Sequence, residues 1–235
     1  MTQDIVVQAP AQAAQLFLLF HGYGADAQDM QPLAKRFADE FPQACVVCVQ
    51  ATEPAEAGFG WQWFPLQGVT EENRPQRVND ALPGFVEIVR AWQKRSGVGH
   101  EATALVGFSQ GGIMSLAASL HETQLCGRVM GFGSRFVSLP SQAPETVTYH
   151  LFHGKSDNVI HYGYAVSAAE HLVAIEADVT ADVLPYIGHE IHPHMIDLAI
   201  EPLRKDKNIK VVNIMSSLKD LEGQEDINEI KVVVD

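Results

Sequence analysis

Short apolar runs alternate along this chain with longer segments in which apolar residues recur at helical spacing. The runs that we predict to be strands are Leu16–Phe20, Cys45–Gln50, Ala104–Gly107, Val129–Phe132, Val147–Phe152 and Val179–Leu184. They are nearly continuous instead of alternating, which is typical of strands covered on both faces of a parallel sheet. Ile5–Gln8 is a further candidate, for an edge strand.

The segments between these runs have the pattern of helices. The candidates are Asp26–Phe41, Asn79–Arg95, Gly111–His121, Tyr162–Glu176 and Pro193–Leu203. In the second of them, Leu82, Phe85, Val86 and Val89 follow the i, i+3, i+4, i+7 spacing of one helix face. Alternating strands and helices predict an α/β fold, with a mostly parallel central sheet and helices on both faces.

Two regions depart from this alternation. Ala51–Arg77 contains three prolines together with Trp61 and Trp63. We expect a long functional loop there, in which the two tryptophans either line a substrate pocket or pack into the core. Residues 206–235 are charged and loosely patterned, so we separate them as a tail from a catalytic domain at 1–205. A disordered tail, an added strand and a helix pair all stay open, and Val232–Val234 is the short β-branched run there.

The composition excludes several classes of partner. The formal net charge is -13, from 16 basic and 29 acidic residues, and such a field repels nucleic acids and anionic membrane surfaces. No apolar stretch reaches the ~18 residues of a membrane span, and no secretory signal opens the chain. We therefore expect a cytoplasmic protein without nucleic-acid partners or stable membrane association. The oligomeric state stays open, with a homodimer as one possibility.

The three cysteines do not suggest a disulfide framework, because their number is odd. Cys45 and Cys48 match C-x-x-C, but the motif lies within an apolar strand candidate, where residues three apart point to opposite faces. A redox motif needs an exposed turn that opens a helix. We predict buried core thiols instead.

A G-x-S-x-G pentapeptide, Gly107-Phe108-Ser109-Gln110-Gly111, joins a predicted strand to a predicted helix. Nucleophilic catalysis by the serine of such a motif needs a tight strand-to-helix turn, on which the hydroxyl is exposed at the carboxyl end of the sheet. Glycines let that turn close without Cβ collisions. The setting predicts that Ser109 is a nucleophile, and Phe108 beside it is a candidate pocket residue.

A serine nucleophile needs a base and an acid that orients the base. In hydrolases whose serine lies on a G-x-S-x-G turn, the acid and then the histidine come later in the chain, each after a later strand. Asp157 follows the strand that ends near Phe152, and His189 follows the strand that ends at Leu184. Asp178 and Asp182 lie at the start of a strand or within it, at the wrong end of the sheet. We therefore predict the set Ser109, His189 and Asp157.

An oxyanion hole requires backbone N–H groups that point at the developing negative charge. The first core strand runs into His21-Gly22-Tyr23-Gly24, and the N–H groups of Tyr23 and Gln110 are the natural donors. The same turn fits the dinucleotide pattern G-x-G-x-x-A. No acid follows the second strand to hold a ribose, however, so this alternative is much weaker.

Three histidines gather in Ile187–Ile196 and raise the question of a metal site. His189-Glu190-Ile191-His192 is one residue short of H-E-x-x-H, the spacing that places two histidines one helical turn apart. Pro193 favours a helix that begins there, so the three imidazoles need not share a face. We expect neither a metal nor an organic cofactor.

Four segments in this order resemble the acyl-protein thioesterase/carboxylesterase family of α/β-hydrolases: LFHGYG, GFSQGG, HGKSD and GHE. The resemblance spans roughly residues 16–203. It implies that Ser109 is the nucleophile, His189 the general base, Asp157 its orienting partner, and Tyr23 and Gln110 the oxyanion donors. Tyr23, Ala25 and Asn158 depart from residues common in the family.

We therefore predict a serine carboxylesterase or thioesterase that acts on small-molecule or acylated substrates through an acyl-enzyme intermediate. Only about fourteen residues separate the strands around Phe132 and Val147, so no cap domain is expected and the site should be open. The alternatives are a non-catalytic binding module with the hydrolase fold and a histidine-dependent metallohydrolase.

Overall fold

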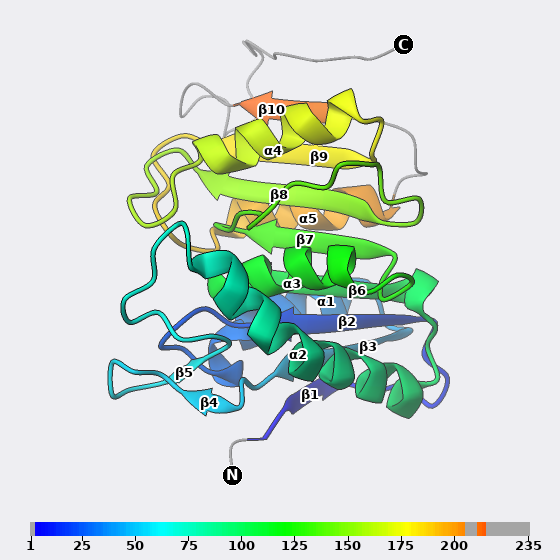
Figure 1. Ribbon diagram of the computed structural model, residues 1–235. Helices are drawn as coiled ribbons and strands as arrows, with labels where there is room; N and C mark the ends of the chain where they lie inside the picture. Colours follow the sequence, from blue (N-terminus) through cyan, green and yellow to red (C-terminus); the bar gives the residue numbers. More distant parts are fainter. Residues whose placement is uncertain (1–2, 205–210, 215–235) are drawn as a thin grey trace.

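The computed structural model describes residues 3–204 and 211–214 and has one large central sheet (Figure 1). Its eight strands run in the order β1-β3-β2-β6-β7-β8-β9-β10. Their bounds are β1 (Ile5–Gln8), β2 (Gln15–Phe20), β3 (Ala44–Val49), β6 (Thr103–Phe108), β7 (Arg128–Phe132), β8 (Thr148–Gly154), β9 (Val179–Leu184) and β10 (Val211–Ile214). Only β1 is antiparallel to its neighbour, so the predicted mostly parallel sheet is confirmed.

Helices cover both faces of this sheet, as predicted. One face carries α2 (Arg74–Ser96), α3 (Gln110–His121) and α4 (Gly163–Ala174), and the other carries α1 (Gln31–Glu40) and α5 (Pro193–Arg204) (Figure 1). Short 3-10 turns, η1 (Ala27–Met30) and η2 (His100–Ala102), precede α1 and β6. Each face has its own hydrophobic cluster: Cys45 belongs to one and Cys48 to the other. Both thiols are free and buried, as expected for a strand with alternating faces.

Helix α2 begins earlier than the apolar pattern predicts. It starts at Arg74 instead of Asn79, and Pro75 lies in its first turn. A proline suits this position because its missing N–H would have no helical acceptor there. The preceding loop also contains a small antiparallel pair, β4 (Glu53–Pro54) and β5 (Trp61–Gln62). The apolar pattern missed both features because they are polar or very short.

No domain is inserted between β7 and β8, in agreement with the prediction of an uncapped fold. Residues 133–147 connect the two strands without a helix or strand of their own. In the segment predicted as a tail, Val211–Ile214 pairs in parallel with β9, while Val232–Val234 lies outside the described residues. Among the helices of the described residues, none has both the length and the apolar character needed to cross a bilayer.

The strand order places the loops that follow β2 and β6 on either side of a crevice. The chain passes from β2 to β3 in one direction, and β6 lies on the other side of β2. In open α/β sheets, ligands bind where the strand order reverses in this way, beyond the carboxyl ends of the strands. Ser109 follows β6 and Tyr23 follows β2, so both lie at this point.

Candidate active site

Ser109 lies on a strained turn between β6 and α3. Its backbone has φ 50° and ψ -117°, a conformation that residues with a side chain rarely adopt. The backbone N–H of Ser109 donates to the carbonyl of Phe132 on the neighbouring strand over 2.9 Å. A Cβ on Gly107 would lie 2.4 Å from Gly112, and one on Gly111 would lie 2.3 Å from the Phe20 carbonyl. The two glycines of the pentapeptide are therefore required by close backbone packing, and the turn projects the serine side chain.

Three loops bring Ser109, His189 and Asp157 into one hydrogen-bonded chain. His189 Nε2 lies 2.9 Å from Ser109 Oγ, and His189 Nδ1 lies 2.7 Å from Asp157 Oδ2. An ionised carboxylate can only accept, so Nδ1 carries the proton and Nε2 is left to accept the serine hydroxyl. The three residues predicted as a set from chain order thus have the geometry of a nucleophile, a base and an orienting acid.

The carboxylate of Asp157 is buried, and both of its oxygens accept hydrogen bonds. Its side chain is 0% exposed, and Oδ1 accepts the backbone N–H groups of Val159 and Ile160, each over 2.8 Å. Burial alone would raise the pKa of this carboxyl, but the hydrogen bonds from His189 and from these two amides outweigh burial and lower the pKa. Asp157 therefore stays ionised beneath the imidazole.

A second histidine touches the same carboxylate, and sequence reasoning did not assign it a role. His153, at the end of β8, is 1% exposed, and its Nε2 lies 3.2 Å from Asp157 Oδ2 and 2.7 Å from the carbonyl of Ile160. Burial lowers the pKa of His153, so it is a neutral ring that donates from Nε2. Its signal in the sequence was His-Gly at the end of a strand, the pattern that also occurs at His21-Gly22.

The predicted oxyanion donors lie beside Ser109. Tyr23, Ser109 and Gln110 line the same cavity. Neither the N–H of Tyr23 nor that of Gln110 has an acceptor within residues 3–204 and 211–214. The N–H of Gln110 opens α3, where the first amides have no helical partner and the helix dipole is positive. Both groups are free to bind an anionic oxygen.

Hydrogen bonds to residues 51–63 hold the turn that contains Tyr23. His21 is 0% exposed; its Nδ1 bonds to the Gly22 carbonyl over 2.7 Å and its Nε2 accepts from Ala51 over 3.2 Å. Gly24 donates to the Trp61 carbonyl, and Trp61 donates to that of Ala25, each over 2.9 Å. His21 therefore supports the shape of the turn.

The three residues predicted to line the substrate pocket have different positions. Phe108 lines a cavity beside His189, and the centroids of the two rings are 4.9 Å apart. Trp63 is instead buried against Phe20 and Phe85, and its indole N–H donates to the carbonyl of His21. Trp63 therefore packs as the second alternative describes, because the indole finds both apolar partners and an acceptor inside, and it lines neither cavity beside Ser109.

Trp61 supports the turn after β2 mainly through its backbone hydrogen bonds. Besides its bonds to Gly24 and Ala25, it lies partly buried against the core, and it is absent from both cavities at the site.

The side chain of Gln110 also holds the segment that contains the two tryptophans. Its side chain accepts the N–H of Trp63 over 2.8 Å and donates to the carbonyl of Phe64 over 2.6 Å. The loop is thereby anchored to the residue that follows the nucleophile.

The other histidines of the 187–196 segment do not converge on His189. His192 immediately precedes α5, and its Nδ1 accepts the N–H of His194 over 3.2 Å. His192 thus caps the helix that Pro193 opens, as the proline suggested. Within the described chain, no three histidine, cysteine or acidic side chains are grouped in a way that could hold a metal ion.

Comparisons with known proteins agree with this geometry. The sequence profile described as Phospholipase/Carboxylesterase matches residues 1–206. The chain is 46% identical over 200 residues to Esterase YpfH of Escherichia coli K12, covering 85% of this chain and 86% of that protein. It is 33% identical over 118 residues to an acyl-protein thioesterase 1 of Gibberella zeae, covering 47% of this chain and 50% of that protein.

Solved structures show the same fold. The crystal structure of esterase PE8 superposes with a TM-score of 0.78 at 27% identity, covering 85% of this chain and 96% of that one. A carboxylesterase from Bacillus cereus gives a TM-score of 0.73 at 16% identity, covering 87% and 94%, which supports the fold alone. By its sequence match and its fold, the chain belongs to the phospholipase/carboxylesterase family of α/β-hydrolases.

Proposed function

We propose that this serine hydrolase cleaves carboxylic esters and thioesters through an acyl-enzyme intermediate on Ser109. The observation that carries the proposal is the continuous hydrogen-bonded chain from Ser109 Oγ through His189 to Asp157, at 2.9 and 2.7 Å. Such spacing suits transfer of the serine proton to the imidazole as the oxygen attacks a carbonyl.

The first half-reaction forms the acyl-enzyme. Ser109 Oγ bonds to the substrate carbonyl carbon while its proton passes to His189 Nε2. Asp157, which is buried and ionised, stabilises the imidazolium that results. The negative oxygen is held by the N–H groups of Tyr23 and Gln110. The intermediate then collapses, and His189 returns the proton to the leaving alcohol or thiol.

The second half-reaction releases the acid. A water molecule gives its proton to His189 Nε2 and attacks the acyl carbon, and Ser109 Oγ leaves with the proton that His189 returns. The same donors hold the second negative oxygen. Every step uses groups of this chain and the substrate with water, and none requires a metal or organic cofactor.

Hydrolysis of p-nitrophenyl acetate and of a short acyl thioester tests the proposal. We expect Ser109→Ala and His189→Ala each to lower kcat by roughly ten-thousand-fold or more. His194→Ala is the matched control and should keep wild-type activity, as should the wild-type enzyme in the presence of a chelator. Activity that survives in Ser109→Ala, or that a chelator abolishes, would contradict the serine mechanism.

A cytoplasmic location and a small-molecule or acylated partner complete the proposal. The location is supported by the three cysteines, which are all free and buried. Burial raises the pKa of both Cys48 and Cys126 to about 12, so these thiols are unreactive core residues. Fractionation of the producing cells, with the esterase activity as the readout, tests the location.

A further inference from the structure

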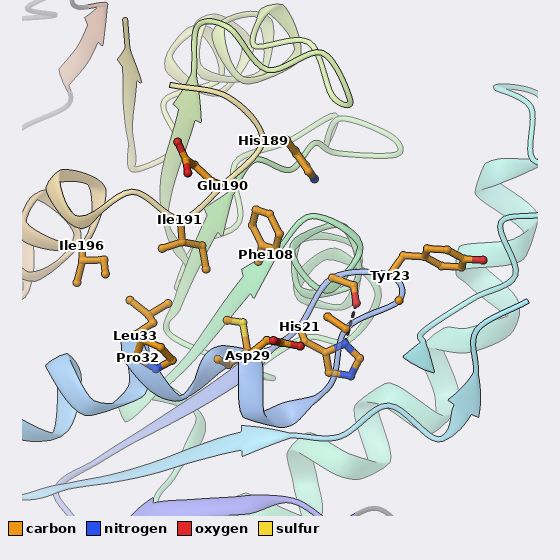
Figure 2. Close-up of a pocket in the computed structure, with 14 residues that line it drawn as sticks. His21, Tyr23, Asp29, Pro32, Leu33, Phe108, His189, Glu190, Ile191 and Ile196 are labelled. Atoms are coloured by element: carbon orange, nitrogen blue, oxygen red, sulfur yellow. Dashed lines mark hydrogen bonds between the residues drawn. The ribbon is translucent and has the colours of Figure 1, made fainter. Parts of the chain in front are cut away.

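Two cavities flank the site, and the proposed mechanism distinguishes their roles. The larger, about 560 Å³, is lined by His189 and Phe108 with Leu33, Ile191 and Ile196 opposite them (Figure 2). The smaller, about 310 Å³, is lined by Ser109 and Gln110. His189 protonates the leaving group, which must therefore depart through the cavity that His189 lines. The acyl group stays bonded to Ser109 and occupies the smaller cavity, which we call the acyl cavity.

The wall of the acyl cavity combines apolar side chains with a charged cluster. The apolar residues are Phe64, Leu66, Val69, Ile113, Val159 and Ile160. The charged cluster is Glu71, Arg74 and Arg135, which lie on the 51–73 loop, on the first turn of α2 and on the loop after β7. An acyl chain that extends beyond the apolar residues has to contact these charges.

In the cluster, Glu71 pairs with both arginines, and Arg135 is the most buried of the three side chains. The Arg135 side chain is 8% exposed, forms an ion pair with Glu71, and lies 4.2 Å from the centroid of the Tyr164 ring. Arg74 pairs with the other oxygen of Glu71 over 3.0 Å. A guanidinium this buried depends on its partners, so displacing Glu71 or covering the cluster with hydrocarbon is unfavourable.

Apolar surface and buried charge act on the acyl chain in opposite directions. Each methylene buried against the apolar wall favours binding by about fourfold. A methylene that covers the cluster loses this gain and also removes water from the half-exposed carboxylate of Glu71.

We propose that the charged cluster of Glu71, Arg74 and Arg135 determines acyl specificity by restricting the enzyme to short acyl groups. The inference rests on the proposed esterase function and names the substrate class of that site. Glu71 and Arg135 are specificity residues in this account, and neither takes part in the reaction itself.

The test is a chain-length profile of kcat/KM with p-nitrophenyl acetate, butyrate, octanoate and dodecanoate. Wild-type enzyme should prefer butyrate to octanoate. Arg135→Met removes the buried charge at similar length and should raise the octanoate-to-butyrate ratio by about tenfold or more. Glu71→Gln keeps the size of the side chain but leaves the buried Arg135 charged and without its ionic partner, so it should leave the ratio at or below the wild-type value.

Arg90→Met is the matched control. Arg90 pairs with Glu122 in an exposed ion pair and lines neither cavity of the site. Its loss should leave the ratio unchanged. Circular dichroism and thermal unfolding that match wild type show that each variant is folded, so a change in the ratio reports specificity.

Three results would overturn the inference. The first is a wild-type enzyme that cleaves octanoate as well as butyrate, and the second is an unchanged ratio in folded Arg135→Met. The third concerns Arg74, whose Nε is buried without a partner among the described residues. If wild-type enzyme prefers a monosuccinate ester to butyrate and Arg135→Met loses this preference, the cluster is an anion site instead. Failure to cleave any ester would overturn the proposed function itself.

Discussion

A buried histidine followed by glycine stands where the chain leaves β2 and again at the end of β8, yet the two pairs support different parts of the site. His21 contacts the backbone of Gly22 and Ala51, and so fixes the turn that presents the N–H of Tyr23. His153 contacts the carboxylate of Asp157 as well as the Ile160 carbonyl. The same two-residue pattern thus positions a backbone donor in one loop and a charged side chain in the other.

This difference determines how much each loop depends on its histidine. The β2 turn is also held by the two bonds between the 24–25 backbone and Trp61, and by the hydroxyl of Tyr23, which accepts from Ala57 over 3.0 Å. Asp157 is held by two amides, by His189 and by His153, and the carboxylate that these groups position orients His189 directly. Loss of a histidine should therefore cost more in the β8 loop.

The largest effect should come from the acid itself. Asp157→Asn removes the acceptor that keeps the proton of His189 on Nδ1, and we expect kcat/KM for p-nitrophenyl acetate to fall by roughly ten-thousand-fold. Asp178→Asn is the matched control: Asp178 accepts from Thr148 before β9 begins, away from the site, and its loss should leave activity near wild type. A fall of less than tenfold in Asp157→Asn would show that another group orients His189.

Replacement of His153 tests a residue that contacts Asp157 but not the reacting atoms. His153→Leu removes the donor to Asp157 and Ile160, so the carboxylate can shift, and we expect kcat to fall by about a hundredfold with little change in KM. His153→Gln keeps a donor and should restore most of the rate. Equal defects in the leucine and glutamine variants would mean that His153 only fills space.

Replacement of His21 should have a smaller effect. His21→Leu removes one of several braces of the β2 turn and no oxyanion donor, so we expect kcat to fall by about tenfold, less than the hundredfold or more that follows loss of a donor. Steady-state kinetics of this variant beside His153→Leu compares the two loops directly. A larger loss in His21→Leu than in His153→Leu would reverse the comparison.

A third buried histidine contributes to stability and has no contact with the site. His150, in the middle of β8, bonds to Thr180 over 2.8 Å, while burial, helped by Arg128, lowers its pKa to about 3. A group that stays neutral when folded and protonates when unfolded stabilises the protein fully above its unfolded pKa of ~6.5, and this stability is lost as the pH falls towards 3.

The consequence is measurable as a pH-dependent stability. His150 alone should cost wild-type protein about 2 kcal/mol of unfolding free energy between pH 7.5 and pH 5. In His150→Gln this part of the loss should disappear, while kcat at pH 7.5 stays unchanged. Denaturant unfolding at both pH values provides the measurement, and an equal loss in the variant and in wild type would contradict the assignment.

The succession of strands and helices along the chain and the identity of the candidate triad could be predicted because both follow from periodicity and chain order. Residues that end parallel strands meet at one edge of the sheet, so Ser109, Asp157 and His189 had to approach one another once their strands were assigned. The same reasoning predicted Tyr23 and Gln110 as donors. It needs no knowledge of loop conformation.

Contacts between loops could not be predicted in this way. Whether Trp63 faces a pocket or the core depends on the path of the 51–73 segment, and the pairing of Glu71 with Arg135 joins residues 64 positions apart on two irregular loops. The contact of His153 with Asp157 depends on how the β8 loop folds back on its own strand. These details depend on tertiary structure, and no spacing in the sequence encodes them.

The central claim, that Ser109 is activated by His189 and Asp157, is tested most directly by labelling with a fluorophosphonate. The account predicts a single label per chain, located on Ser109 by peptide mass spectrometry. The label should be absent in Ser109→Ala, strongly slowed in His189→Ala and unaffected in His194→Ala. Folded wild-type protein that takes up no label, or takes it up equally well without His189, would contradict the account.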